Sequence, residues 1–378
     1  MLKNLLIFDF PNKEGENEPI YFINPIKVIS TYNIDEVNQA LLDVENFLES
    51  GFYVAGYLSY EAATAFDAAM TVKKDYKMPL LWFAVYQEPH YGNYLSGKKT
   101  NYSVSPWKSN VPRNTYDNNI SKIKYAISNG ETYQVNYSIR LTSKFSGDDI
   151  SYYYNLAKAQ KAQYSAYLNI DRFRILSSSP ELFFRWDGNK IITRPMKGTY
   201  KRGRWPEEDM LHEKQLKHSE KNQAENLMIV DLVRNDLGRI SEVGSVDVSS
   251  LFEIERYPNV FQMTSTVSAT TKPNTTLADV FKALFPCGSV TGAPKISTMK
   301  KIASLEDSAR EVYCGAIGFI KPNKESVFNV PIRTVWIDTE TGIANYGVGG
   351  GVIWDSEAED EYSELLAKAS LLESIIHT

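Results

Sequence analysis

Short runs of alternating apolar and polar residues dominate the first hundred positions, and this period of two predicts β-strands. The predicted strands cover residues 1–10, 19–23, 52–60 and 79–86. Residues 35–51 place apolar side chains at helical spacing, and Gly51 marks the end of an amphipathic helix. Residues 88–115 are polar and rich in turn formers, so we expect a loop or an internal boundary there.

Helix and strand patterns are more closely mixed after residue 115. The predicted helices cover residues 116–130, 151–163, 207–239, 277–285, 295–306 and 359–376. The predicted strands cover residues 132–145, 164–170, 173–179, 182–186, 190–193, 315–321, 326–338 and 342–354. Helices and hairpin-type strands without a regular strand–helix–strand alternation predict an α+β fold with antiparallel sheets. We expect one domain over 1–378, with a looser part at 1–110 and a core at 115–378.

The composition is that of a globular protein and narrows the ligand chemistry. Apolar residues make up 43% and charged residues 23%, with a net charge of -5. Such a chain has no general attraction for nucleic acid or anionic lipid, so an anionic ligand needs a local group of cations. Cys287 and Cys314 are too few for a disulfide framework, and no signal peptide or membrane span is recognisable. We therefore expect a cytoplasmic protein.

The stretch RPMKGTYKRG, residues 194–203, places Lys197 between a Pro-Met pair and a glycine, directly after a predicted strand. Further cations follow it closely, and a run of cations is most often a solvated face. A lysine held in place by its surroundings can instead act as a nucleophile. The residues alone leave both interpretations open.

A second unusual stretch is NYGVGGGVIWDSEAEDEYSELLAKA, residues 345–369. Its three consecutive glycines stand at the start of a predicted strand, where they weaken the strand but let backbone N–H groups approach a ligand. Glu361, Glu364 and Lys368 follow at a spacing that places them on one helix face. This combination suits a carboxylate ligand bound partly through Mg2+, which prefers one or two protein carboxylates with ligand oxygens and water. A salt-bridged surface helix is the alternative.

Three further stretches are weak signals when taken singly. In AENLMIVDLVRNDLGR, residues 224–239, Glu225 shares a helix with other charged residues, which often simply pair. In FPCGSVTGAPK, a turn rich in Ser, Thr and Gly precedes Pro294 inside a new helix, and such a helix N-terminus can bind an anion. Arg333 falls on the predicted strand VPIRTVWID, where one arginine is more often a surface residue than an anion clamp.

Seven ordered motifs give these stretches a common meaning. They are SSSPELFFR, RPMKGT, AENLMIVDLVRNDLGR, FPCGSVTGAPK, YCGAIGF, FNVPIRTV and YGVGGGVIWDSEAEDEYSELLAKA. In this order they resemble the chorismate-utilising enzymes, a family that includes anthranilate synthase component I, aminodeoxychorismate synthase component I, isochorismate synthase and salicylate synthase. The resemblance is looser before residue 115, where GYLSYEAATAFD is similar to an N-terminal motif. It implies large antiparallel sheets packed as a sandwich with helices outside.

The resemblance also implies a shared site for chorismate and Mg2+. It assigns Glu225 and Glu364 as Mg2+ ligands, and Glu361 lies on the same helix face as Glu364. It assigns Arg333 and Tyr313 to the enolpyruvyl carboxylate of chorismate. The other residues expected around the substrate, chiefly at its ring carboxylate, are Gln134, Gly198, Thr199, Ser289, Gly349, Gly350, Gly351 and Lys368. An arginine fork at one end and a metal or N–H cradle at the other suits a ligand with two carboxylates.

A few variable positions of the family select the reaction. Gln134 stands where a lysine activates water in the isochorismate and salicylate enzymes, and glutamine cannot act as a general base near neutral pH. Glu181 aligns with the family's general acid, and burial can raise the pKa of such a carboxyl until it can protonate the departing C4 hydroxyl. Lys197 stands where anthranilate synthases carry alanine and where aminodeoxychorismate synthases carry a lysine understood to attack C2.

Two more positions bear on the product. Gln262 stands where many anthranilate synthases carry a histidine thought to assist pyruvate elimination, and Asn226 also replaces a histidine of many relatives. Both differences favour a product that keeps the enolpyruvyl group. We expect the nearby cations Arg194, Lys201 and Arg202, together with Mg2+, to favour the neutral amine that attack by Lys197 requires.

The resemblance therefore predicts conversion of chorismate and ammonia to 4-amino-4-deoxychorismate, on the way to 4-aminobenzoate and folate. No segment resembles the cysteine nucleophile motif of a glutamine amidotransferase, so we expect a separate subunit to supply ammonia and a separate aminodeoxychorismate lyase to process the product. Two alternatives stay open. Lys197 and Gln262 argue against an anthranilate synthase component I, and the intact Glu181, Glu225 and Glu364 argue against a non-catalytic chorismate-binding paralogue.

Overall fold

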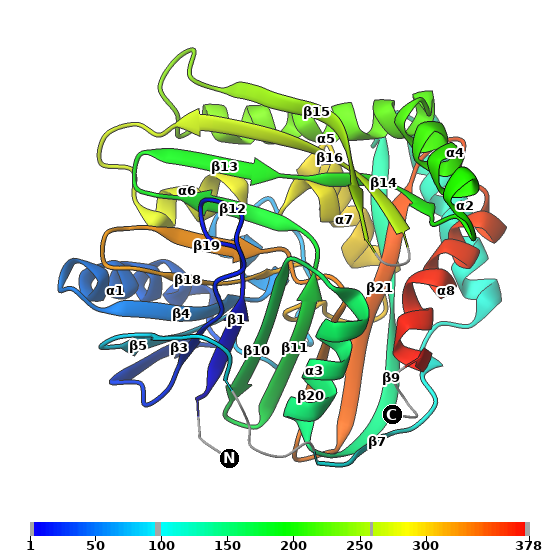
Figure 1. The fold of residues 1–378 in the computed structure, drawn as a ribbon. Helices are drawn as coiled ribbons and strands as arrows, with labels where there is room; N and C mark the ends of the chain where they lie inside the picture. Colours follow the sequence, from blue (N-terminus) through cyan, green and yellow to red (C-terminus); the bar gives the residue numbers. More distant parts are fainter. Residues whose placement is uncertain (1–3, 95–99, 258–259, 375–378) are drawn as a thin grey trace.

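The computed structural model describes residues 4–94, 100–257 and 260–374, which form two large antiparallel sheets (Figure 1). The first sheet contains, in spatial order, β17 (Gly292–Ala293), β9 (Gln134–Gly147), β21 (Ile343–Val352), β20 (Thr334–Asp338), β11 (Phe173–Ser179), β10 (Tyr164–Ile170), β1 (Leu6–Asp9), β2 (Ile20–Phe22) and β6 (His90–Tyr91). Two short strands also pair with β9, namely β7 (Tyr102–Val104) and β8 (Lys108–Ser109).

The second sheet contains, in spatial order, β14 (Met196–Lys201), β16 (Val260–Thr270), β13 (Lys190–Arg194), β12 (Leu182–Trp186), β19 (Ser326–Asn329), β18 (Ala316–Ile320), β4 (Tyr53–Leu58), β5 (Leu81–Tyr86) and β3 (Lys27–Thr31). The strand β15 (Asp247–Arg256) pairs with β16. The α-helices are α1 (Val37–Glu49), α2 (Arg113–Ser128), α3 (Asp149–Gln160), α4 (Pro206–Lys217), α5 (Glu220–Gly238), α6 (Leu277–Leu284), α7 (Lys295–Leu305) and α8 (Ala358–Ser374). Three 3-10 helices are η1 (Ile34–Glu36), η2 (Tyr60–Ala65) and η3 (Gly288–Val290).

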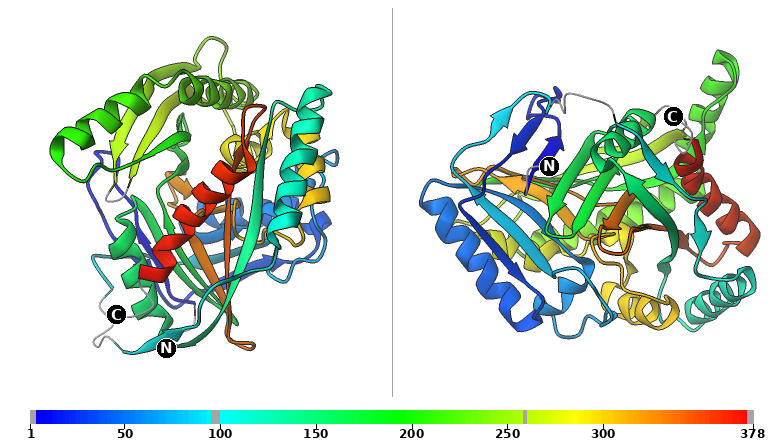
Figure 2. Two further views of the ribbon diagram at one scale, coloured as in Figure 1. Left: turned by 90° about the vertical axis from the view of Figure 1, so that its right-hand side faces the viewer. Right: turned by 90° about the horizontal axis from the view of Figure 1, so that it is seen from below.

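The two sheets pack against each other, with helices on their outer faces (Figures 1 and 2). Alternating strand residues of both sheets, such as Phe8 and Trp82, fill the core between them. The outer face of the second sheet is covered by α1, α5 and α6, and that of the first by α2, α3 and α8. The predicted α+β sandwich with external helices is confirmed. The N-terminal part supplies β1 and β2 to the first sheet and β3 to β5 to the second, so both sheets join it to the rest of the chain.

The predicted helix 207–239 is wrong in one respect, because it is two helices, α4 and α5. The first ends at Lys217, and Ser219 begins the second as its N-cap, with its hydroxyl accepting a hydrogen bond from the backbone N–H of Asn222. A serine at this position stabilises a new helix start more than a continuing helix. The first turns of α5 then lie at the site described below, where Lys221, Asn222 and Glu225 line the cavity.

The predicted strand 326–338 is also wrong, because β19 lies in the second sheet and β20 in the first. Pro331 cannot donate a backbone hydrogen bond to a sheet, and Arg333 has a φ of 51°, which a continuous strand does not allow. Arg333 therefore lies on a connection between the two sheets, and not on a strand as predicted.

Other differences are smaller. Part of the expected loop 88–115 forms the short strands β6, β7 and β8, and β15 and β16 were not predicted. Pro294 is the N-cap of α7 and lies just outside the helix. The first three residues of predicted strand 1–10, residues 95–99 of the expected loop and the last two residues of predicted helix 359–376 lie outside the described residues. Across the described ranges, no helix combines the length and the apolar character that a membrane crossing requires.

Candidate active site

A cavity of about 370 Å³ opens where β14 of the second sheet approaches β21 of the first, with α5 and α8 beside it. The predicted site residues that line it are Glu181, Lys197, Gly198, Thr199, Glu225, Ser289, Tyr313, Arg333, Gly349, Gly350, Gly351, Glu361, Glu364 and Lys368. Gln134 lies directly behind this lining and is 1% exposed. The structure thus brings together residues that are far apart in the sequence.

A β-bulge on β14 directs Lys197 into the cavity. The pairing between β14 and β16 shifts between Met196 and Thr199, so that two residues of β14 face one residue of β16. Gly198, the second of these two, has a φ of 97° and packs against Asn222 of α5. The side-chain amide of Asn226 donates to the carbonyl of Lys197 at 3.4 Å, which ties the bulge to α5.

Lys197 ends among polar groups that are shielded from water. Its side chain is 12% exposed, and its Nζ lies 4.0 Å from Oε2 of Glu225. A Cβ added to Gly351 would lie 2.2 Å from Lys197 Nζ and 2.1 Å from Gln134 Nε2, so the two side-chain tips meet at one point. The Oε1 of Gln134 is buried without a hydrogen-bond partner among the described residues. A buried acceptor without a partner is unusual in a folded protein.

The neighbouring cations of the RPMKGTYKRG stretch are directed elsewhere. Arg194 pairs with Glu255 at 2.9 Å, and Arg202 pairs with Asp209 at 2.6 Å. Lys201 is exposed. The expectation that these three cations act on Lys197 is therefore corrected, because their charges are paired or solvated outside the cavity.

Glu181 is buried at the inner end of the cavity, directly before β12. It is 2% exposed, and Ser289 Oγ donates to its Oε1 at 2.6 Å. Burial raises the pKa of Glu181 to about 7, against the lowering effects of the Ser289 hydrogen bond and the Lys197 charge. A carboxyl with this pKa is partly protonated near neutral pH and can give a proton to a leaving group.

Three carboxylates face the cavity from α5 and α8. Glu364 pairs with Lys368 at 2.8 Å, and the Lys368 charge holds the pKa of Glu364 below its usual value. Glu361 accepts from Ser356 at 2.7 Å, and burial raises the pKa of Glu361. Glu225 completes the set from α5.

These carboxylates fit Mg2+ in chemistry but do not form a closed metal cage. Within the described ranges, no three His, Cys, Asp or Glu side chains are grouped closely enough to hold a metal ion by themselves. Mg2+ needs only one or two protein carboxylates when a ligand and water supply the remaining oxygens. The donor set of Glu225, Glu361 and Glu364 therefore suits Mg2+ only together with a bound ligand.

The opposite wall of the cavity carries Arg333. In the part of the chain that the structure describes, no hydrogen bond or ion pair engages the Arg333 guanidinium, which lines the cavity. Burial lowers the pKa of Arg333, although an arginine stays charged at any ordinary pH. Tyr313 lies nearby, with its ring packed so closely on Gly347 that a Cβ there would be 2.4 Å away. This wall is suited to an anion, and to a carboxylate in particular.

The three consecutive glycines lie at the end of β21, and not at the start of a strand as predicted. β20 pairs with β21 only as far as Tyr346, so one edge of the glycine segment has no strand neighbour among the described residues. The Lys368 ammonium donates to the carbonyl of Gly349 at 2.9 Å. A Cβ on Gly349 would lie 2.2 Å from the Tyr137 carbonyl, so that position needs glycine. The backbone of Gly349 to Gly351 and the side chain of Lys368 therefore line the same side of the cavity.

Several lining residues were not predicted as site residues. They include Asn136, Lys221, Asn222 and Tyr346. Gln262, which the sequence singled out only for its bearing on the product, also lines the cavity. The helical spacing was a usable signal for two of them, since Lys221 and Asn222 lie four and three residues before Glu225 and share its face of α5.

Comparison with known proteins places this cavity in context. The model of the family described as "chorismate binding enzyme" matches residues 3–374. Aminodeoxychorismate synthase component 1 of Klebsiella aerogenes is 40% identical over 269 residues, which are 71% of this chain and 59% of that protein. Anthranilate synthase component 1 of Saccharolobus solfataricus is 32% identical over 369 residues, which are 93% of this chain and 86% of that protein. The chain thus spans about three fifths of the Klebsiella relative.

A solved structure shares the fold. Anthranilate synthase component I from Streptococcus pneumoniae superimposes with a TM-score of 0.82 at 25% identity, covering 93% of this chain and 91% of that chain.

Proposed function

The chain belongs to the family of chorismate binding enzymes, and from this premise we propose that it converts chorismate and ammonia to 4-amino-4-deoxychorismate. The observation that carries the proposal is the position of Lys197, which a bulge holds inside the cavity beside Glu225 and Gln134. The similarity to relatives named aminodeoxychorismate synthase supports the same product.

In the proposed complex, the two ends of the cavity would each bind one carboxylate of chorismate. Arg333, whose guanidinium has no partner among the described residues, and Tyr313 would bind the enolpyruvyl carboxylate. The glycine segment, Lys368 and Ser289 would surround the ring carboxylate. In this orientation the ring lies between Lys197 and Glu181, and Gly198 and Thr199 of β14 form the adjoining wall.

The proposed reaction then proceeds in two substitution steps. The neutral Lys197 amine forms a bond to C2, the ring double bonds shift, and the C4 hydroxyl leaves as water with a proton from Glu181. Ammonia next forms a bond to C4, the double bonds shift back, and the Lys197 amine leaves C2. The proton lost by the incoming nitrogen returns to the Glu181 carboxylate, so the enzyme ends in its starting state. Overall, one ammonia replaces one water.

Mg2+ belongs to the same proposal. Glu225, Glu361 and Glu364 would hold it together with oxygens of the bound substrate. When bound, it supplies positive charge that offsets the substrate carboxylate and the surrounding glutamates.

The proposed partners follow from the product and from the names of the relatives. The designation "component 1" supports a separate glutamine amidotransferase subunit that supplies ammonia. The product keeps its enolpyruvyl group, so an aminodeoxychorismate lyase would be needed to release 4-aminobenzoate for folate synthesis. We place these reactions in the cytoplasm.

The alternative product is anthranilate, because the Saccharolobus anthranilate synthase matches almost the whole chain. Lys197 and Gln262 both line the cavity, at the positions where the alternative predicts alanine and histidine. A product assay separates the two. Purified protein is incubated with chorismate, Mg2+ and an ammonium salt, and the products are identified by chromatography and mass. We expect 4-amino-4-deoxychorismate from the wild type and none from Lys197→Ala.

Lys201→Ala is the matched control, since Lys201 lies on the same strand but is exposed. It should retain wild-type turnover. Formation of anthranilate and pyruvate by the wild type would refute the proposed product. Equal turnover by Lys197→Ala and Lys201→Ala would refute the role of Lys197.

A further inference from the structure

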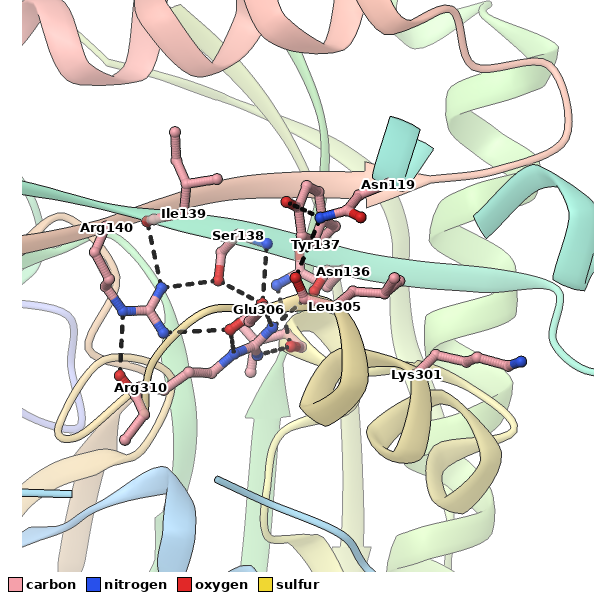
Figure 3. Close-up of polar contacts among 12 residues, drawn as sticks. Asn119, Asn136, Tyr137, Ser138, Ile139, Arg140, Lys301, Leu305, Glu306 and Arg310 are labelled. Carbon is pink, nitrogen blue, oxygen red and sulfur yellow. Dashed lines mark hydrogen bonds and ion pairs between the residues drawn. The ribbon is translucent and has the colours of Figure 1, made fainter. Parts of the chain in front are cut away.

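Behind the cavity, one carboxylate and two guanidinium groups form a buried ionic network (Figure 3). Glu306 is the C-cap of α7 and is 4% exposed. Arg310 follows it four residues later, beyond the end of α7, and is 1% exposed, and Arg140 comes from β9 and is 6% exposed. Burying three charges costs desolvation free energy that apolar packing would avoid, so the network calls for a further explanation.

Glu306 is the common partner of the network. Its carboxylate accepts hydrogen bonds from Arg310 Nη2 at 2.6 Å and from Arg140 Nη2 at 3.3 Å. It also accepts from the hydroxyl and the backbone N–H of Ser138 on β9, at 2.7 and 3.0 Å. Burial acts to raise the pKa of Glu306, but Arg310 and Arg140 outweigh it and hold the pKa below its usual value. Glu306 is therefore a fixed negative charge between two fixed positive charges.

Other ionisable groups surround the arginines from the N-terminal part of the chain. Glu61 accepts hydrogen bonds from the backbone N–H groups of Arg310 and Glu311, at 2.7 and 3.0 Å. The ring of Tyr60 lies 4.6 Å from the Arg310 guanidinium. These contacts leave Arg310 little freedom to move.

The far side of Arg310 reaches the wall of the cavity. Its Nη1 donates to the carbonyl of Val290 at 2.7 Å, and its Nη2 donates to the carbonyl of Asn136 at 2.7 Å. The Asn136 side chain donates to the same Val290 carbonyl at 3.0 Å. Val290 and Asn136 both line the cavity, so Arg310 clamps η3 to β9. Arg140 acts on the opposite wall, where its guanidinium lies 5.1 Å from the centre of the Tyr313 ring.

The clamped 3-10 helix carries Ser289, which precedes Val290 and donates to Glu181 at 2.6 Å. The other groups that face Glu181 are Lys197 and the backbone N–H of Met196, both from β14, and the thiol of Cys287, whose Sγ lies 4.0 Å from Glu181 Oε1 and 3.2 Å from Ser289 Oγ. None of them contacts Arg310 in the described structure. A change in the clamp therefore reaches Glu181 through Ser289.

We propose that Glu306 is a positioning residue that, through Arg310 and the carbonyl of Val290, holds the Ser289 hydroxyl against Glu181. This series of contacts from Glu306 to Glu181, called the relay below, bears on turnover through the proposed function of Glu181 as the acid. The relay itself is a property of the free protein. It explains why charged groups occupy this position, since a fork that donates to Glu306 and to two carbonyls at once needs a guanidinium.

The test is an infrared titration of the Glu181 carboxyl in the free, full-length protein. The Glu181 band is the one that disappears in Glu181→Gln. Ser289→Ala removes the hydrogen bond directly and should raise the Glu181 titration midpoint by about one pH unit, because that bond favours the charged form. Glu306→Gln should raise the midpoint in the same direction. The double variant should shift no further than Ser289→Ala, because both changes act through one contact.

Asp307→Asn is the matched control, since it removes one negative charge at the next residue, which is exposed. It should leave the midpoint unchanged. An unchanged midpoint in folded Glu306→Gln overturns the proposal, and so does a double variant whose shift is the sum of the two single shifts. If Glu306→Gln does not fold, Arg310→Lys keeps the charge but loses the fork, and an unchanged midpoint there overturns the proposal equally. The titration is carried out without chorismate, so its result does not depend on the outcome of the product assay that tests the proposed function.

Discussion

Lys197 and Gln134 reach the same point above the backbone of Gly351, where a single added methyl group would overlap with both side-chain tips. The two residues come from different sheets, β14 and β9, so Gly351 marks the place where the sheets meet inside the cavity. Position 351 must therefore be glycine if both side chains are to keep their positions.

Gly351→Ala should therefore displace Lys197 and Gln134 and leave the fold intact, because both clashes involve the ends of flexible side chains. We expect kcat/KM for chorismate to fall by about a hundredfold, as misplacement of a reacting group by about 1 Å can do. Steady-state kinetics and a thermal unfolding curve measure the two effects. Gly238→Ala is the control, because nothing lies within 4 Å of the added Cβ in this helical position. Equal kinetics in the two variants would contradict the prediction.

The Glu181 carboxyl predicts the pH dependence of turnover. Burial raises the pKa of Glu181 to about 7, and an acid catalyst is active only while protonated. The rate, expressed per concentration of free ammonia, should decline as pH rises through about 7. Glu181→Gln should lose activity by about a hundredfold or more and should lose this limb of the profile. If Glu181→Gln still shows the wild-type decline of rate with rising pH, the decline is caused by another group.

The raised pKa values of Glu61 and Glu311 predict that the protein loses stability as the pH rises from about 5 to about 8. Burial raises the pKa of Glu61 to about 8 and that of Glu311 to about 7, from an ordinary value of 4.5. A carboxyl with a raised folded-state pKa stabilises the fold below its unfolded pKa, and this contribution is lost as pH rises through the folded pKa. The urea midpoint should therefore fall between about pH 5 and pH 8. A midpoint that rises over this interval would show that other groups dominate.

Arg333 should control substrate affinity more than the chemical steps. Arg333→Lys keeps a positive charge but loses the fork that binds a carboxylate in two places. We expect KM for chorismate to rise by about tenfold or more, with a smaller change in kcat. Arg234→Lys is the control, since Arg234 is exposed and pairs only with Asp231 among the described residues. A tenfold loss confined to kcat would place Arg333 at the reacting atoms.

The carboxylates of α5 and α8 predict a dependence on Mg2+. Chelation should abolish turnover, and Glu225→Gln or Glu364→Gln should raise the Mg2+ concentration for half-maximal activity by about tenfold or more. Glu359→Gln should not, because Glu359 is an exposed residue of the first turn of α8 that pairs with Arg113. Full activity in the presence of a chelator would contradict the metal site.

The sequence predicted the fold class and most of the cavity because ordered motifs carried both. The predicted element boundaries failed where a single residue ends an element that its neighbours would continue. Ser219 interrupts a helix that composition alone continues, and Pro331 and Arg333 send one predicted strand into two sheets. The three glycines lie at the end of their strand, where β21 pairs with β9 but no longer with β20.

The ionic network was beyond sequence reasoning because it joins residues that are far apart in the sequence. Glu306 and Arg310 are four residues apart in the sequence, but Arg140 is far away in the sequence and meets them only in the folded protein, where β9 lies beside α7. Nothing in the local pattern around Arg140 indicates that its side chain points to the interior. Such long-range ion pairs become visible only in the folded structure.

The central claim, that Lys197 attacks chorismate, is tested most directly by peptide mass analysis after incubation with chorismate and Mg2+ without ammonia. Trypsin does not cut a modified lysine or an arginine followed by proline, so an adduct on Lys197 should appear in the peptide of residues 191–201. We predict on this peptide the mass of chorismate less one water, which should disappear when ammonia is added. Formation of 4-amino-4-deoxychorismate by protein whose Lys197 stays unmodified throughout would contradict the account.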